Sequence, residues 1–171
     1  MDAMKADFEI RQLHARYSQA IFRKDAASVG ELFVEEGEWR VGGQIMTGRD
    51  NIVRFIDGVF PQFQRILMLF YTPVVDVSGG EITSRTFVVE RSKFADGRPF
   101  SPMGIYFDRF VEVDGRLLFK WRLFQTQYAG PPDLSADFLD VPDYGPSPAM
   151  PSLDEETIDR SGVGAKAKGE G

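Results

Sequence analysis

The segment Gly104–Phe110 constrains the fold of this chain more than any other stretch. It alternates aromatic and polar residues, and a turn at Asp114-Gly115 joins it to a second apolar stretch, which together predict a long β-hairpin. Side chains two residues apart share one face of a strand, so Tyr106 and Asp108 are expected on the same face. If that face lines an apolar cavity, a phenol and a carboxyl group meet there, and such groups can transfer protons without a cofactor.

Helical patterns precede this hairpin and strand patterns surround it. Apolar residues recur at helical spacing in 8–24, 26–33 and 47–60, and the period then changes to two. Extended stretches are expected at residues 38–41, 66–77, 82–94, 102–113 and 117–128. This order predicts an α+β fold in which a curved antiparallel sheet wraps over about three N-terminal helices.

The composition changes after the last predicted strand. Residues 1–129 are expected to form one domain, because their length suits a single core. Prolines spread among Asp, Ser and Gly predict an extended arm at 130–153, docked through Phe138, Leu139 and Tyr144. The remainder, 154–171, is expected to be a disordered tail.

Charge and composition exclude several classes of protein. A formal net charge of −6 argues against non-specific nucleic-acid binding. The chain has no cysteine and one histidine, which excludes disulfides, thiolate metal sites and multi-histidine metal sites. No apolar run approaches the roughly 20 residues of a membrane span, and no signal peptide is evident, so we expect a cytoplasmic protein.

A series of short motifs resembles the nuclear transport factor two-like superfamily, in its SnoaL-like branch. The motifs are, in chain order, Arg16-Tyr17, Leu32-Phe33, Glu38-Trp39, Thr47-Gly48-Arg49-Asp50-Asn51-Ile52 and Gly104-x-Tyr106-x-Asp108-Arg109. Relatives in this superfamily include ketosteroid isomerase, scytalone dehydratase, polyketide cyclases and hexachlorocyclohexane dehydrochlorinase. The resemblance implies a cone-shaped barrel around a deep pocket and catalysis without a cofactor, although other members of the superfamily only bind partners or ligands.

The resemblance also implies roles for individual residues. Tyr17 falls where ketosteroid isomerase has its oxyanion-hole tyrosine, and Tyr106 falls where that enzyme has its second hydrogen-bond donor. Trp39 matches a pocket tryptophan of the dehydrochlorinase.

Three positions depart from the relatives. The catalytic Asp of the dehydratases and the dehydrochlorinase corresponds to Phe22, unless a small insertion lets Asp25 serve, and their catalytic His corresponds to Met68. The base of the isomerase corresponds to about Val41, so this chain lacks both the dyad and that base.

Two carboxylates remain as candidate proton-transfer groups. Asp108 is either a general base or the ion-pair partner of an arginine, with Arg122 on the adjoining strand as the candidate. Glu90 lies at the pocket mouth if the even-numbered face of 82–94 points inward. If the odd-numbered face points inward, Arg85 and Arg91 become anion clamps.

We therefore expect a cofactor-independent lyase or isomerase that acts by proton abstraction or elimination on a small hydrophobic aromatic substrate. A phenolic, lignin-derived diaryl compound that releases formaldehyde is one such substrate. Dehydration, polyketide cyclisation and non-catalytic binding of a ligand or protein are the alternatives. The residues expected to act in catalysis are Tyr17, Tyr106, Asp108 and Glu90. The residues expected to contact the substrate are Phe22, Trp39, Phe55, Met68, Phe70, Trp121 and Gln125. We also expect the protein to form a homodimer or homotrimer.

Overall fold

The N-terminal third of the protein is largely helical. The structure is a computed structural model that describes residues 1–158. Its helices are α1 (Ala3–Arg23), α2 (Ala26–Gly30), α3 (Arg49–Val59) and the short 3₁₀ helix η1 (Phe60–Gln62). Asp2 and Asp25 cap α1 and α2 by accepting hydrogen bonds from backbone N–H groups of their first turns, which fixes where these two helices begin. Across residues 1–158 the helices fall short of the length or apolar character that a membrane span needs.

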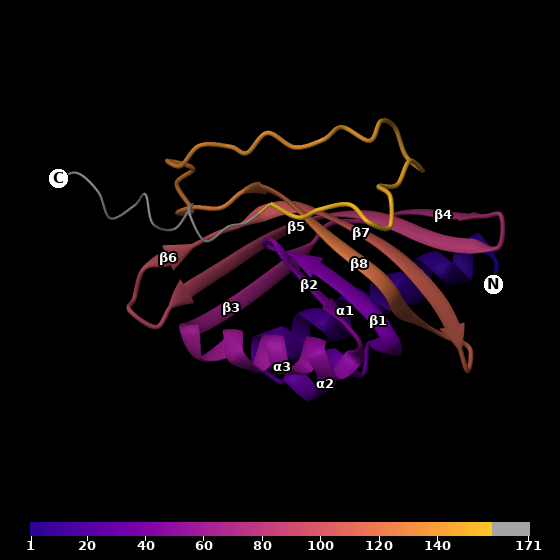
Figure 1. Ribbon diagram of the computed structural model, residues 1–171, viewed down its shortest axis with the longest axis horizontal. Helices are drawn as coiled ribbons and strands as arrows, with labels where there is room; N and C mark the ends of the chain where they lie inside the picture. The colour runs from indigo at the N-terminus through magenta and orange to yellow at the C-terminus, as the bar shows by residue number, and fades with distance from the viewer. Residues whose placement is uncertain (159–171) are drawn as a thin grey trace.

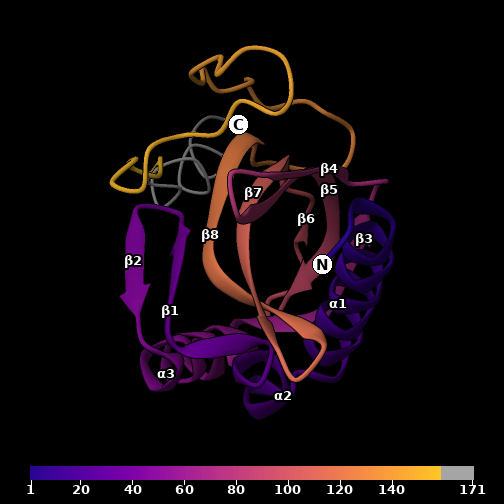
Figure 2. The ribbon, with the colours of Figure 1, turned by 90° about the vertical axis from the view of Figure 1, so that its right-hand side faces the viewer.

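The rest of the domain is a single curled sheet. Its strands are β1 (Phe33–Val41), β2 (Gln44–Thr47), β3 (Phe63–Phe70), β4 (Val74–Ser78), β5 (Glu81–Phe94), β6 (Pro99–Phe100), β7 (Met103–Val113) and β8 (Arg116–Tyr128). The strand order is β2-β1-β8-β7-β5-β3, and β4 and β6 also pair with β5. The helices lie on the opposite side of this sheet from the C-terminal arm (Figures 1 and 2). This is the predicted α+β cone, with its core between the sheet and the helices.

Two details of the predicted sheet are wrong. The stretch 66–77 is two strands, because residues 71–73 interrupt it, Pro73 has no N–H to donate, and β3 and β4 pair with different halves of β5. The sheet is also not wholly antiparallel, since β1 runs parallel to β8. Sequence pattern places strands but does not report pairing between segments so far apart in the chain.

A β-bulge at Lys120 decides which side chains of β8 face the helices. The pairing of β7 with β8 jumps from Arg109↔Trp121 to Phe110↔Phe119, which leaves Lys120 as the extra residue. Past the bulge the alternation is shifted by one residue. Arg122 therefore points to the concave side together with Phe119, and Trp121 points to the convex side.

The C-terminal arm covers part of the convex face. Trp121 donates from Nε1 to the carbonyl of Leu153 (3.1 Å), and Gln125 donates to the carbonyl of Pro142 (2.8 Å). The ring of Tyr144 lies edge-on to Phe107, with centroids 5.2 Å apart. The arm thus packs on strands of its own chain and buries a second apolar cluster of Ile105, Phe107, Trp121 and Leu123.

The predicted arm contacts and tail can be compared with the structure as far as residue 158. Phe138 forms an isolated bridge with Tyr128, and the Leu139 N–H donates to Gln127. Within the predicted tail, the Glu155 carbonyl accepts from Arg40 and the Thr157 hydroxyl accepts from the Gly43 N–H. Residues 159–171 of the predicted tail lie outside the described residues.

Gly104 allows β7 and β8 to approach each other beside the core. A Cβ at this position would overlap the carbonyl oxygen of Gln125 and lie 2.9 Å from two ring carbons of Phe124. We expect Gly104→Ala to lower the free energy of unfolding by roughly 2 kcal/mol or more, because overpacking strains a filled core. Chemical denaturation measures this.

Gly58 provides the matched control for that substitution. It lies in α3, and a Cβ there would have no atom within 4 Å. Gly58→Ala should raise stability by about 0.5–1 kcal/mol, because Ala is the better helix former. Equal effects of the two substitutions would contradict the close approach at Gly104.

Candidate functional site

A small apolar cavity lies between the concave face of the sheet and the helices. Its volume is about 120 Å³, and most of its wall is aliphatic or aromatic. Side chains from α1, α3 and strands on both halves of the sheet contribute to the wall. Among the predicted site residues, the lining includes Tyr17, Trp39, Phe55, Met68, Glu90 and Tyr106.

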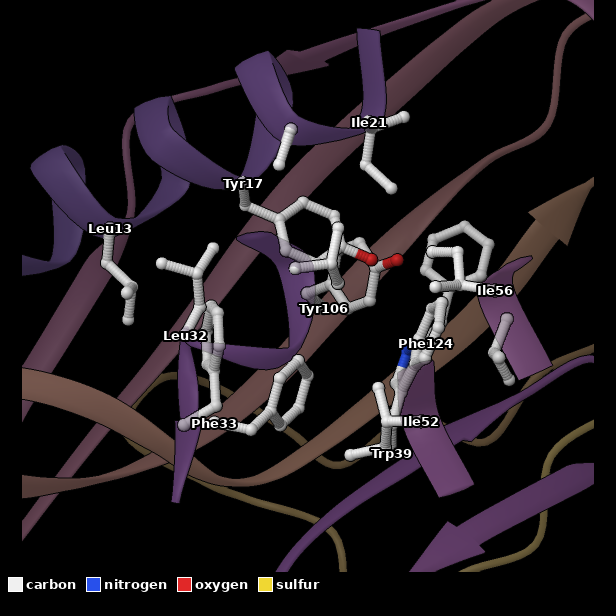
Figure 3. Close-up of a cluster of buried hydrophobic side chains, with 14 of the residues drawn as sticks. Leu13, Tyr17, Ile21, Leu32, Phe33, Trp39, Ile52, Ile56, Tyr106 and Phe124 are labelled. Atoms are coloured by element: carbon white, nitrogen blue, oxygen red, sulfur yellow. The ribbon is translucent and has the colours of Figure 1, made fainter. Parts of the chain in front are cut away.

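Two phenols meet at this cavity. Tyr17 reaches it from α1 and Tyr106 from β7, with ring centroids 6.4 Å apart and planes at 70° (Figure 3). Both side chains are almost completely buried. Burial, followed by the neighbouring Tyr106, raises the pKa of Tyr17 well above its ordinary value. Tyr17 therefore keeps its proton at neutral pH and can donate a hydrogen bond to a bound oxygen.

Two further polar groups border the cavity. The indole Nε1 of Trp39 is buried and has no hydrogen-bond partner among residues 1–158. Buried donors are usually paired, so this N–H is a ready donor to a guest. Glu90 is half-buried on β5 opposite Met68 on β3, and it contributes a carboxylate to the cavity wall. Within the described chain no three His, Asp or Glu side chains gather to hold a metal.

Behind the two phenols lies a buried ion pair. The Asp108 carboxylate accepts from Arg122 Nε (2.9 Å) and Nη2 (3.3 Å), and it lies 3.3 Å from His14 Nε2. The Asp108 and Arg122 side chains are 0% exposed. Asp108 shares a face with Tyr106, as predicted, but it is not part of the cavity wall. Asp108 is therefore the ion-pair partner of Arg122 in the structure, which is the second of the two alternatives that the sequence left open.

Arg122 is enclosed by aromatic rings. Its Cζ lies 3.7 Å from the ring centroid of Tyr106, 4.0 Å from Phe119 and 4.4 Å from Tyr17. Phe70 lies further away, at 5.5 Å. The cation is thus in contact with the faces of the same two phenols whose hydroxyls border the cavity.

The inward face of β5 is the even-numbered one. Val88 and Glu90 line the cavity, which is the first of the two alternatives that the sequence left open. Arg85 lies on the opposite face, where it donates to the carbonyl of Gly145, and Arg91 is exposed. Neither arginine is an anion clamp in this cavity.

Four predicted substrate contacts do not line the cavity. Phe22 is 53% exposed, because helical geometry turns its neighbour Ile21 inward instead. Trp121 and Gln125 lie under the arm on the convex face. Phe70 stacks on His14 at 4.5 Å, outside the cavity wall.

Several lining residues were missed from the sequence. Ile21 was within reach, since it stands one helical turn after Tyr17 and must share its face. Phe124 shares a strand face with Arg122, and Val88 shares one with Glu90. The sequence does not show which of these faces points inward, because that depends on the strand register. Met68 and Val41 do line the cavity, so apolar side chains occupy the positions to which the resemblance assigns a His and a base.

Comparisons with known proteins identify the family. The sequence pattern of the SnoaL-like domain matches residues 2–125. The chain therefore belongs to the SnoaL-like family. No curated protein sequence matches this chain.

Solved structures share the fold. A candidate scytalone dehydratase from Novosphingobium aromaticivorans is similar at 25% identity and a TM-score of 0.67, covering 71% of this chain and 83% of the other. Hexachlorocyclohexane dehydrochlorinase LinA-type3 from Novosphingobium barchaimii is similar at 13% identity and a TM-score of 0.65, covering 78% and 92%. ActVI-ORFA from Streptomyces coelicolor is similar at 21% identity and a TM-score of 0.61, covering 69% and 94%.

His14 gives a pH-dependence prediction. Burial lowers its pKa and Arg122 does so further, while the hydrogen bond and charge of Asp108 oppose them. Below about pH 6.5 the unfolded chain therefore takes up a proton on His14 more readily than the folded chain, and stability falls as pH falls. The chain has one histidine, so His14→Gln should flatten the change in melting temperature between about pH 7 and pH 5.

Thermal unfolding of both proteins across that range measures the effect. An identical pH slope in the two proteins would show that His14 is not held neutral by burial.

Proposed function

We propose that this protein is a cofactor-independent lyase or isomerase that moves a proton on a small aromatic substrate. One observation carries the proposal. Two buried tyrosines and Trp39, whose indole N–H has no partner among residues 1–158, line an apolar cavity that also has the carboxyl group of Glu90 in its wall. Tyr17, Tyr106 and Trp39 are the proposed donors to an oxyanion, and Glu90 is the proposed proton acceptor.

The size of the cavity favours one ring. A cavity of about 150 Å³ in another protein binds benzene, so about 120 Å³ suits a single aromatic ring. A phenol or a monocyclic enone fits within it. A lignin-derived diaryl compound fits only with one ring inside and the remainder at the mouth.

The proposed chemistry needs only these side chains. Glu90 removes a proton from the carbon activated by the substrate's ring or carbonyl, and the negative charge that develops moves to the substrate oxygen. Tyr17 and Tyr106 hydrogen-bond that oxygen, and one such donor can contribute roughly 3 kcal/mol to the transition state. In an isomerisation, Glu90 returns the proton to another carbon. In an elimination, the electron pair expels the leaving group.

The relatives support the elimination branch. A dehydratase removes water and a dehydrochlorinase removes hydrogen chloride, and the similar structures include a candidate scytalone dehydratase and a hexachlorocyclohexane dehydrochlorinase. Loss of formaldehyde from a phenolic diaryl compound extends this branch. An ionised para-phenol expels a benzylic hydroxyl group, which leaves as water, and a quinone methide forms. A neighbouring hydroxymethyl group then loses its O–H proton and leaves as formaldehyde, and the electron pair of the broken C–C bond returns to the ring. Dehydration and polyketide cyclisation are the competing reactions.

A second candidate function is non-catalytic binding of a small apolar ligand. Met68 and Val41 favour it, because they place apolar side chains at the positions to which the resemblance assigns the histidine and the base. Either function is compatible with a homo-oligomer. Leu67, Leu69 and Phe87 are each 46–57% exposed on the part of the convex face that we propose as a subunit contact.

Three substitutions separate catalysis from binding. With phenolic substrates that carry a benzylic leaving group, Tyr17→Phe, Tyr106→Phe and Glu90→Gln should each lower kcat by at least about 10²-fold, as expected for lost donors or proton transfer. Tyr71→Phe is the matched control, since Tyr71 is 62% exposed and outside the cavity wall. Turnover that survives all three substitutions would contradict the site.

A further inference from the structure

The orientation of the Asp108–Arg122 pair directs its positive end at the phenols. The Asp108 carboxylate accepts hydrogen bonds from Nε and Nη2 of the Arg122 guanidinium, while Nη1 has no hydrogen-bond partner among residues 1–158. The ring faces of Tyr106, Phe119 and Tyr17 cover the guanidinium at 3.7–4.4 Å. His14 contacts the carboxylate. The pair is therefore neutral as a whole but polarised toward the cavity.

A buried positive charge next to a phenol favours the phenolate form. Burial raises the pKa of Tyr17 most, and Arg122 acts against that rise more strongly than Asp108 adds to it. Water is excluded from this region, because the ion pair is completely buried and His14 nearly so. Charge therefore acts over a longer range than at the surface.

We propose that Arg122 is a positioning residue whose buried charge strengthens Tyr17 and Tyr106 as hydrogen-bond donors to an oxyanion in the cavity. Asp108 and His14 hold the guanidinium against the rings. This inference rests on the proposed function, since it assigns the reason why those phenols stabilise negative charge. The groups that face Arg122 are Asp108, His14 and the two tyrosines.

The ionisation of bound para-nitrophenol tests this directly. It is a single-ring compound whose phenol and phenolate forms absorb at different wavelengths, and it ionises near neutral pH. Wild-type protein should bind it and lower its apparent pKa. In Asp108→Leu/Arg122→Met, which removes both charges together, the apparent pKa of the bound compound should rise by about one unit, a tenfold loss of preference for phenolate. A simultaneous replacement avoids leaving one buried charge unpaired.

Two single variants test the direction of the change in the apparent pKa of the bound compound. Asp108→Asn leaves the Arg122 charge uncompensated, so the bound compound should ionise at lower pH than in the wild type. Arg122→Lys keeps the charge and should stay closer to the wild type than the double variant does. A purely structural role of the pair does not predict a higher apparent pKa in the double variant together with a lower one in Asp108→Asn. If the double variant does not fold, the direction of the pKa shift in Asp108→Asn decides whether the proposal stands.

The matched control lies on the convex face of the same sheet. Arg109 pairs with Glu81 at 2.8 Å and lies over the Trp121 ring at 5.8 Å. Glu81→Gln/Arg109→Met removes a carboxylate–guanidinium pair that is partly exposed and lies away from the cavity, so the apparent pKa of the bound compound should stay unchanged.

The outcomes separate the two proposals. If wild type, the double variant and Asp108→Asn all bind the compound with the same apparent pKa, the proposed role of Arg122 is overturned and the proposed function stands. Failure of wild-type protein to bind para-nitrophenol at all overturns both.

Discussion

The buried ion pair between Asp108 and Arg122 is the interaction on which the rest of the site depends. Removing two charges from water costs several kcal/mol per ion, so such a pair persists only with good geometry and further partners. Here the carboxylate accepts two bonds from the guanidinium and contacts His14, and aromatic rings enclose the cation. The pair links β7, β8 and α1, and it fixes the two phenols that these elements bring to the cavity.

The bulge at Lys120 makes this arrangement possible. Without the extra residue, strict alternation from Phe119 would turn Trp121 inward and Arg122 outward. With it, Arg122 points to the helices, and Trp121 instead receives the C-terminal arm. One inserted residue therefore puts Arg122 on the concave side with the cavity and Trp121 on the side that the chain covers with its own arm.

The sequence predicts the fold and brings some of the candidate site residues together. Periodicity predicts the helices and most strands. Tyr17, Tyr106 and Glu90 lie on one cavity wall, as helix and strand geometry and family position predict, and their catalytic roles stay a prediction. Phe22, Trp121 and Gln125 do not line the cavity. One position along α1 decides whether a side chain faces inward, and the bulge at Lys120 reverses which side chains of β8 do so. The pairing of Asp108 with Arg122 was one of two readings, and only three-dimensional register could choose between them.

The central claim is that the cavity binds one aromatic ring with its oxygen between two phenols. A crystal structure of the protein with a bound single-ring phenol tests it most directly. The account predicts that the ligand oxygen lies within hydrogen-bond distance of both Tyr17 and Tyr106, with its ring among the apolar lining near Trp39. A ligand bound elsewhere, or a cavity that stays closed around its own side chains at saturating phenol, would contradict it.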